Sequence, residues 1–277
     1  MRPFLKWAGG KYRIIERIKE KLPPGKRLIE PFVGSGAVFL NTDYPAYLLC
    51  DSNRDLISLY RRLQREGPAF IEYCKGLFTP ENNTPERYYE LREEFNRTDD
   101  ERRKAALFVY LNRHCYNGLC RYSLRGEFNT PFGRYRRPYF PEREMLCFWE
   151  KSRKAVFLCC DFRESLALAE PGDVVYCDPP YVPLSDTANF TSYSEGGFSL
   201  DDQRDLAREA ERLSRLGIPV LLSNHDTEFT RSIYASAQIT SFGVQRCISC
   251  DGRNRGRAAE LLALFADSPQ GRLYLIG

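Results

Sequence analysis

Residues 171–181 read Pro-Gly-Asp-Val-Val-Tyr-Cys-Asp-Pro-Pro-Tyr, and this stretch decides the fold that we expect. Its apolar run, residues 174–177, predicts a fully buried strand. The strand must end at Pro179, because a proline cannot donate to a sheet ladder and because it biases Asp178 away from the helical region. The sequence therefore predicts a stiff loop at the carboxyl end of a buried strand, where open α/β sheets bind their ligands.

The four residues of this loop, Asp178-Pro179-Pro180-Tyr181, offer a defined set of chemical groups. Asp178 supplies a carboxylate, the prolines supply carbonyls without a competing N–H group, and Tyr181 supplies a flat ring. Two hydrogen-bond acceptors and one stacking face suit an exocyclic amino group on an aromatic ring. An ordinary turn that ends a strand is the alternative interpretation of this tetrapeptide.

The bulk composition is that of an ordinary globular protein and argues against a disordered chain. The 277 residues are 43% hydrophobic and 28% charged, with a formal net charge of +4. The amino terminus shows no apolar core long enough for a signal peptide, so we expect a cytoplasmic protein whose ten cysteines are reduced. Cys247 and Cys250 have a metal-like spacing, but no second pair accompanies them, and we expect no metal site.

Two glycine-rich stretches predict the close approach of a ligand to the backbone. Residues 4–11 place Trp7 and Lys11 beside two adjacent glycines, without the spacing of a Walker A loop. Residues 27–36 predict a strand that runs into a Gly-x-Gly turn at Gly34 and Gly36, after which a helix begins. The next predicted strand, 46–51, ends in Asp51, at the position where such folds hold a ribose diol.

The pattern of elements changes twice along the chain. Residues 56–144 predict an inserted helical domain, because they contain helical patterns without alternating strands, at 56–65, 68–78, 87–95 and 101–110. Alternation then resumes with strands at 155–162 and 218–226, a helix at 199–216 that Ser199 caps, and an antiparallel pair at 239–249 and 260–265. His225 ends one of these strands, where a structural role is more common than a chemical one. The basic loop 251–257 suits DNA phosphates.

Residues 112–137 combine positive charge with aromatic rings. Six arginines stand against Glu127 alone, which gives a local charge of +5, and tyrosines and phenylalanines are interleaved with them. Asn117-Gly118 and Gly126 are turn signals, so we predict a β-hairpin with cationic and aromatic tips. Because arginine pairs with guanine in the major groove or binds phosphate, this segment predicts nucleic-acid contact in preference to a plain charged face.

These motifs, in this order, resemble those of Dam-type DNA adenine-N6 methyltransferases. The resemblance runs nearly end to end and rests on residues 4–11, 31–36 and 178–181, together with 111–113, 116–122 and 131–135, which are similar to that family's recognition hairpin. It implies an α/β fold with a Rossmann-like class I methyltransferase sheet and an inserted helical DNA-recognition domain that carries a β-hairpin.

The same resemblance implies the domain limits, the cofactor and the partner. Residues 1–55 and 145–277 would form the catalytic domain, and residues 56–144 would form the recognition domain with its hairpin at 112–137. The implied cofactor is S-adenosylmethionine, and the implied target is the adenine of GATC in double-stranded DNA. We expect a monomer that uses neither a membrane nor a metal.

The resemblance also assigns roles to single residues, each at a position that matches a motif of the family. The catalytic positions are Asp178, Pro179, Pro180 and Tyr181. The cofactor positions are Trp7, Lys11, Phe32, Gly34, Gly36, Asp51, Asp161, Phe162 and Asp178. The DNA positions are Lys6, Tyr116, Asn117, Leu119, Arg121, Pro131 and Arg134. His114 and Ser123 stand where relatives carry tyrosine and asparagine, a departure that bears on flanking-sequence preference and processivity.

The implied reaction is base flipping followed by direct in-line methyl transfer at the Asp-Pro-Pro-Tyr loop. Cytosine-C5 methylation would need a cysteine nucleophile, usually in a Pro-Cys pair, and the chain contains no Pro-Cys dipeptide. Cytosine-N4 methylation and RNA adenine methylation could use the same tetrapeptide. A DNA-binding regulator with an inactive cofactor site is the alternative from another class of protein.

Overall fold

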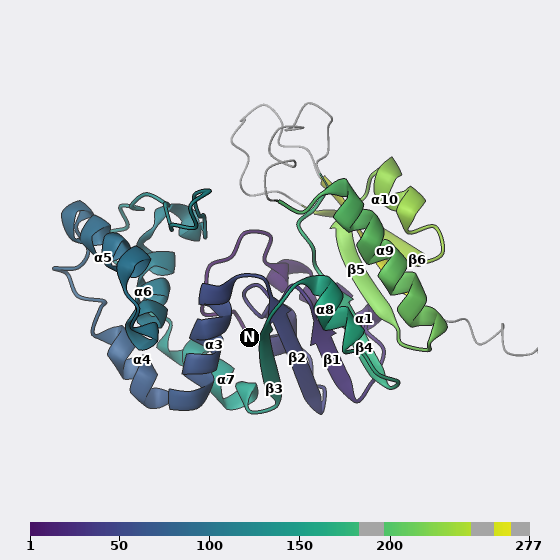
Figure 1. Cartoon of the computed structure of the whole chain (residues 1–277), viewed down its shortest axis with the longest axis horizontal. Coiled ribbons are helices and arrows are strands. Elements are labelled where there is room, and N and C mark those ends of the chain that lie inside the picture. The colour runs from purple at the N-terminus through teal and green to yellow at the C-terminus, as the bar shows by residue number, and fades with distance from the viewer. Residues whose placement is uncertain (183–196, 245–257, 267–277) are drawn as a thin grey trace, which may run out of the picture. The chain divides into compact units, whose positions relative to one another are not determined.

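The computed structural model of the chain describes residues 1–182, 197–244 and 258–266 and has an α/β fold (Figure 1). The order of the strands across the sheet is β3-β2-β1-β4-β5-β7-β6. Their bounds are β1 Arg27–Glu30, β2 Ala46–Asp51, β3 Ala155–Cys159, β4 Asp173–Cys177, β5 Val220–His225, β6 Gln238–Val244 and β7 Ala258–Phe265. This is the expected Rossmann-like arrangement of a mostly parallel sheet.

The chain divides into two compact units, each with its own core. Unit 1 comprises Met1–Glu16, Val33–Asp43 and Tyr47–Cys160. It contains the 3₁₀ helices η1 (Lys11–Ile14) and η2 (Tyr116–Gly118) and the helices α2 (Ala37–Asn41), α3 (Arg54–Glu66), α4 (Pro68–Lys75), α5 (Pro85–Arg97), α6 (Glu101–His114) and α7 (Glu142–Ser152). Helix α3 packs against both α6 and β3. The core includes a cluster of buried rings from Phe4, Phe39, Tyr60, Phe148 and Phe157.

Unit 2 comprises Arg17–Phe32, Tyr44–Ala46 and Asp161–Gly277. It contains β1, β4, β5, β6 and β7 with the helices α8 (Phe162–Ala167), α9 (Leu200–Arg215) and α10 (Glu228–Ile233), while α1 (Ile15–Lys21) crosses the unit boundary. Strand β4 is parallel to β1 and to β5, and β7 is antiparallel to β5 and β6. Because β4 and β5 are parallel, the loop after β4 and the polar end of β5 lie at the same edge.

Local sequence signals explain where the helices begin. The side chains of Asn53, Thr84 and Asp100 accept hydrogen bonds from main-chain N–H groups at the starts of α3, α5 and α6. Ser199 and Asp202 form a capping box at the start of α9. The helices predicted at 56–65, 87–95, 101–110 and 199–216 are therefore confirmed, with starts that match these caps.

The strand predictions are confirmed with one correction. The predicted strand at 155–162 ends at Cys159, because the carboxylate of Asp161 accepts a hydrogen bond from the main chain of Arg163 and caps α8, which begins at Phe162. Helices α7 and α10 were not predicted. The antiparallel pair is confirmed as β6 and β7, and residues 245–249 and the loop 251–257 lie outside the described residues.

The two compact units are defined by contacts between residues, not by function. The predicted boundaries of the catalytic and recognition domains, at residues 55 and 145, therefore stay a prediction. In the described parts of the chain, no helix has the length and apolar character needed to cross a membrane.

Candidate active site and nucleic-acid interface

The loop that follows β4 is held at its main chain by three side chains from elsewhere in unit 2. Gln203 Nε2 donates to the Pro180 carbonyl at 2.7 Å. The Val182 N–H donates to Asn224 Oδ1 at 3.1 Å, and His225 Nδ1 lies 2.6 Å from the Val182 carbonyl. A carbonyl oxygen only accepts, so His225 carries its proton on Nδ1. The ring of His225 therefore positions the loop.

The side chains of Asp178 and Tyr181 in this loop are also bound. Ser223 Oγ donates to Asp178 Oδ1 at 2.9 Å, and the Tyr181 hydroxyl donates to Glu260 Oε2 at 3.3 Å. The Tyr181 ring meets the His225 ring edge to face, with centroids 4.8 Å apart. Burial raises the pKa of Tyr181 well above its ordinary value, so the phenol stays neutral.

Asp178 and Pro179 place two acceptors side by side at the end of β4. The Asp178 carboxylate is half-buried, and Pro179 is buried. Within the described residues, no donor reaches the Pro179 carbonyl, whereas the next carbonyl along the chain is bound by Gln203. The arrangement leaves the carboxylate and this carbonyl suited to accept the two N–H bonds of an amino group.

Three of these contact residues, Gln203, Ser223 and Asn224, are fully buried and were not singled out in the sequence. Ser223 and Asn224 come from the Ser-Asn-His run that ends β5, so the polar end of an apolar strand was the available signal. Gln203 lies one turn into α9, and its burial could not be inferred from a helix start that is otherwise acidic and exposed.

In unit 1, the Gly-x-Gly turn is joined to the expected ribose acid. The Gly34 N–H donates to Asp51 Oδ2 at 3.0 Å, and the Asn53 N–H donates to Asp51 Oδ1 at 2.9 Å. The pKa of Asp51 is raised because burial outweighs these two hydrogen bonds, which lower it. Gly36, whose φ is 72°, precedes α2.

Trp7 and Lys11 lie near the same glycine-rich backbone. Gly34 has φ 47°, and a Cβ there would meet Trp7 Nε1 at 2.8 Å, so the indole lies directly against the turn. Lys11 is buried, and its Nζ donates to the Gly9 carbonyl at 2.7 Å. Unit 1 therefore brings Trp7, Gly34 and Asp51 together.

In unit 2, three phenylalanine rings form a cluster beside α8. The rings of Phe32 and Phe162 stack with centroids 5.7 Å apart, and Phe198 contacts both, at 5.5 Å and 5.4 Å. Phe32 and Phe162 were predicted to contact the cofactor, whereas Phe198 was missed. An isolated phenylalanine before a helix cap gives no sequence signal of its own.

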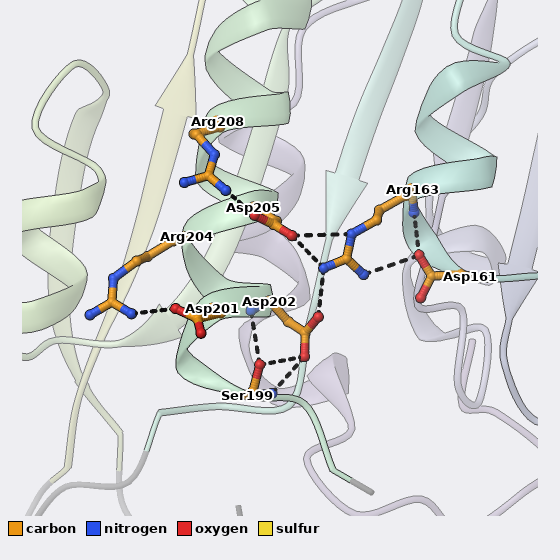
Figure 2. Close-up of polar contacts among 8 residues, drawn as sticks. All are labelled: Asp161, Arg163, Ser199, Asp201, Asp202, Arg204, Asp205 and Arg208. Atoms are coloured by element: carbon orange, nitrogen blue, oxygen red, sulfur yellow. Dashed lines mark hydrogen bonds and ion pairs between the residues drawn. The ribbon is translucent and has the colours of Figure 1, made fainter. Parts of the chain in front are cut away.

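An ionic cluster joins the starts of α8 and α9 (Figure 2). Arg163 pairs with Asp202 at 2.6 Å, with Asp205 at 2.5 Å and with Asp161 at 3.4 Å. The hydrogen bonds that Arg163 donates to Asp205 and Asp202 raise the pKa of its guanidinium. Asp161, the expected cofactor contact, thus caps the start of α8 and also pairs with Arg163.

The recognition segment departs from the predicted hairpin. Residues 112–114 belong to α6, and the two arms meet only through isolated antiparallel bridges, Cys115 with Phe132 and Tyr122 with Phe128. The arms do not form a regular ladder, because η2 and the positive φ of Asn117 interrupt the first arm. The predicted β-hairpin is therefore an irregular antiparallel loop.

This loop presents its predicted DNA residues to the outside. All of them except Lys6 are exposed, namely Tyr116, Asn117, Leu119, Arg121, Pro131 and Arg134. Among the described residues, the non-glycine residues with positive φ are Asn117 at 54° and Arg134 at 53°. Such strained backbone is typical of functional sites, where the surrounding structure must hold it.

Lys6 is held beside this loop by its main chain and by its ammonium group. Asn112 accepts from the Lys6 N–H at 2.8 Å and donates to the Lys6 carbonyl at 2.7 Å. Lys6 Nζ lies 3.9 Å from the centre of the Tyr135 ring. A Cβ on Gly118 would collide with the Lys6 side chain at 2.3 Å, so only glycine fits there. Burial and the nearby Arg113 lower the pKa of Lys6.

Arg121 is oriented by a neighbour in the opposite arm. Its Nε donates to Asn129 Oδ1 at 2.6 Å, and its Nη2 donates to the Asn129 carbonyl at 3.2 Å. The guanidinium plane is thereby fixed while the side chain stays exposed.

Metal ligands do not gather in the described part of the chain, where no group of three or more His, Cys, Asp or Glu side chains could hold an ion. Cys247 and Cys250 lie outside it. Among the cysteines described there, Cys74, Cys115 and Cys177 form no disulfide bond.

The chain is similar to adenine-specific DNA methyltransferases over most of its length. Residues 7–248 match the family described as D12 class N6 adenine-specific DNA methyltransferase. The DNA adenine methylase of Serratia marcescens is 55% identical over 265 residues, which cover 95% of this chain and 98% of that protein. The DNA adenine methylase of Escherichia coli K12 is 54% identical over 95% of each chain. That of Vibrio cholerae O395 is 52% identical over 95% of this chain and 96% of its own.

Proposed function

Because the chain belongs to the D12 class of N6 adenine-specific DNA methyltransferases, we propose that it transfers the methyl group of S-adenosylmethionine to N6 of the adenine in duplex GATC. The observation that carries the proposal is the loop after β4, where Asp178 and the Pro179 carbonyl stand together and Gln203, Asn224 and His225 hold the main chain. Family membership decides in favour of adenine in DNA over the cytosine-N4, RNA and regulator alternatives.

The chemistry follows from the acceptors that the loop offers. The N6 lone pair of adenine is delocalised into the ring, which makes the amino nitrogen a poor nucleophile. Hydrogen bonds from N6 to the Asp178 carboxylate and to the Pro179 carbonyl would favour a pyramidal nitrogen. Its lone pair would take the methyl group as the sulfonium–methyl bond breaks to leave a thioether, and N6 would give up one proton. Fixed positions and preorganised charge supply the catalysis, and no covalent intermediate with the protein is needed.

The target base must leave the DNA stack to reach these acceptors, at a cost of a few kcal/mol. Tyr181 offers a replacement stacking face, and its neutral, hydrogen-bonded phenol keeps the ring in place. Tyr116 and Asn117, which are exposed on the recognition loop, are the residues that we propose to enter the DNA stack.

The residues assigned to the cofactor fit an adenosyl group in chemical character. The Gly34 turn and the Asp51 carboxylate suit a ribose, and the rings of Phe32 and Phe162 suit a planar base. Trp7 closes the turn so tightly that only glycine fits at position 34. When bound, S-adenosylmethionine supplies an electrophilic methyl group on a sulfonium.

The recognition loop provides the groups for reading the DNA. Arg121 has the fork geometry that pairs with guanine O6 and N7, and Asn129 sets its plane. Lys6, Leu119 and Pro131 are the other proposed base contacts, and Arg134 is the proposed phosphate contact.

The test is methyl transfer from labelled S-adenosylmethionine to two duplexes, one with GATC and one with a single changed base. We expect label only on GATC, recovered as N6-methyladenine. Label on both duplexes would refute the specificity, and label on cytosine would refute the assigned target atom. Asp178→Ala should abolish turnover while DNA binding survives, so measurable methylation by that variant would overturn the catalytic role.

We also propose that the enzyme acts as a monomer in the cytoplasm. The thiols of Cys74, Cys115 and Cys177, which form no disulfide bond, support a reducing compartment. Light scattering during gel filtration should give the mass of one chain, 32.1 kDa. A stable dimer whose dissociation abolishes activity would contradict the monomer.

A further inference from the structure

We propose that Tyr176 and Ser223 form a chain of two hydroxyl groups that positions the carboxylate of Asp178. This inference rests on the proposed catalytic role of Asp178 and adds two positioning residues to it. The register between the parallel strands creates the arrangement, since Tyr176 lies beside Leu221 and Cys177 beside Leu222. The next pair along the strands is therefore Asp178 and Ser223.

The alternation of side chains places the three groups on one face. Tyr176 and Asp178 are two residues apart, so they point to the same side of the sheet. The Tyr176 hydroxyl lies 3.0 Å from Ser223 Oγ, and Ser223 Oγ lies 2.9 Å from Asp178 Oδ1. Tyr176 and Ser223 are buried away from solvent, at 2% and 0% exposure.

The direction of the hydrogen bonds follows from the number of protons. Ser223 has one hydroxyl proton, and the Asp178 carboxylate is a stronger acceptor than the Cys177 carbonyl, which lies farther away at 3.4 Å. With that proton committed to Asp178, Ser223 can only accept from Tyr176. Tyr176 remains a donor because burial raises the pKa of its phenol well above the ordinary value.

Two consequences follow for the carboxylate. A hydrogen bond to a carboxylate favours its charged form, so the Ser223 hydroxyl helps to keep Asp178 an acceptor. A donor from β5 also fixes the rotation of the carboxylate relative to the Pro179 carbonyl. Among the described residues, other titratable groups that act on this part of the sheet are Tyr181 in the loop, Cys177 on β4, His225 on β5, Glu260 on β7 and Glu30 on β1.

The experiment uses the full-length enzyme and Ser223→Ala. We expect kcat on a GATC duplex to fall about tenfold, the cost of one charge-assisted hydrogen bond of roughly 1.4 kcal/mol. The affinities for S-adenosylmethionine and for DNA should stay within twofold. The acidic limb of the kcat profile should move to higher pH, because the carboxylate has lost a donor. Ser223→Thr, which keeps the hydroxyl, should restore both kcat and the profile.

Tyr176→Phe tests the outer member of the chain. It should lower kcat less than Ser223→Ala, and it should have no further effect in the Ser223→Ala background, because the two residues act in series. Ser152→Ala and Tyr47→Phe are matched controls that remove buried hydroxyls in unit 1, which bond to the carbonyls of Trp149 and Thr42.

The outcomes separate this inference from the function on which it rests. If Asp178→Ala is inactive while Ser223→Ala is folded and has the kcat and pH profile of the wild type, the hydroxyl chain is refuted and the catalytic role stands. If Asp178→Ala is active, the catalytic role itself fails. Additive losses in the double variant would refute the serial arrangement.

Discussion

His114 should make the stability of the protein depend on pH in a way that one substitution removes. The ring is buried at the end of α6, where it stacks on Tyr110 with centroids 3.9 Å apart and lies 5.0 Å from Phe78. Its Nδ1 donates to the Tyr110 carbonyl at 2.8 Å. Burial, together with smaller effects of the charges of Lys6 and Arg113, lowers the pKa of His114 from 6.5 to about 4.

The size and direction of the effect follow from this pKa difference. Below pH 6.5 the unfolded chain protonates His114 and the folded chain does not, so the free energy of unfolding falls as the pH drops from 6.5 towards 4. Two-state linkage with these values gives a loss of about 2 kcal/mol between pH 7 and pH 5. The main chain of His114 accepts from the Gly133 N–H, so the recognition loop is anchored at the titrating residue.

Urea unfolding followed by tryptophan fluorescence at pH 7 and pH 5 measures the effect. His114→Phe keeps the stacking and removes the titration, so its free energy of unfolding should fall by about 2 kcal/mol less than that of the wild type over this interval. His114→Gln should flatten the dependence by the same amount, although it loses the ring contacts at both pH values. Equal losses in the wild type and in both variants would refute the reasoning.

Three further substitutions test other parts of the site. Gly34→Ala places a Cβ 2.8 Å from Trp7 Nε1 at a positive φ. It should lower the free energy of unfolding by about 1–2 kcal/mol and weaken the binding of S-adenosylmethionine measured by calorimetry. Unchanged binding would contradict the close approach. Arg121→Ala should reduce discrimination between GATC and a one-base variant by roughly 1–3 kcal/mol in kcat/KM, and an unchanged ratio would remove it from the base readers. Gln203→Met should lower the free energy of unfolding by about 1–3 kcal/mol and should also lower kcat. Gln64→Met removes comparable hydrogen bonds to main-chain carbonyls in unit 1, so it should lower stability alone.

The sequence predicted most of the fold because short apolar runs and capping residues act locally. Two short apolar runs, residues 46–51 and the run before Asp178, have no alternating polar residues, a pattern that predicts buried strands. Both runs are strands in the structure. The prediction of a regular recognition hairpin was wrong in detail. Asn117 adopts a left-handed conformation that asparagine tolerates, and the sequence alone does not distinguish this conformation from a regular turn.

The sequence indicates the candidate site where the chemical groups lie on consecutive residues. The loop from Asp178 to Tyr181 carries its acceptors and its ring in four consecutive residues, so the tetrapeptide alone indicates an amino-group site. The residues that hold it, Gln203 and Asn224, come from 23 and 42 positions away from their main-chain partners. Such contacts depend on the packing of α9 and β5, which composition and periodicity do not encode.

The irregular recognition loop has a consequence for how the DNA target of this enzyme could change. Its main chain is secured from behind, where Asn96 bonds both the N–H and the carbonyl of Phe128, and Tyr88 donates to the Thr130 carbonyl. The outward side chains therefore contribute little to the folding of the loop. Under the function that we propose, selection, natural or in the laboratory, can vary them with a small loss of foldability, so that new target sequences become accessible while the methyl-transfer chemistry is inherited unchanged.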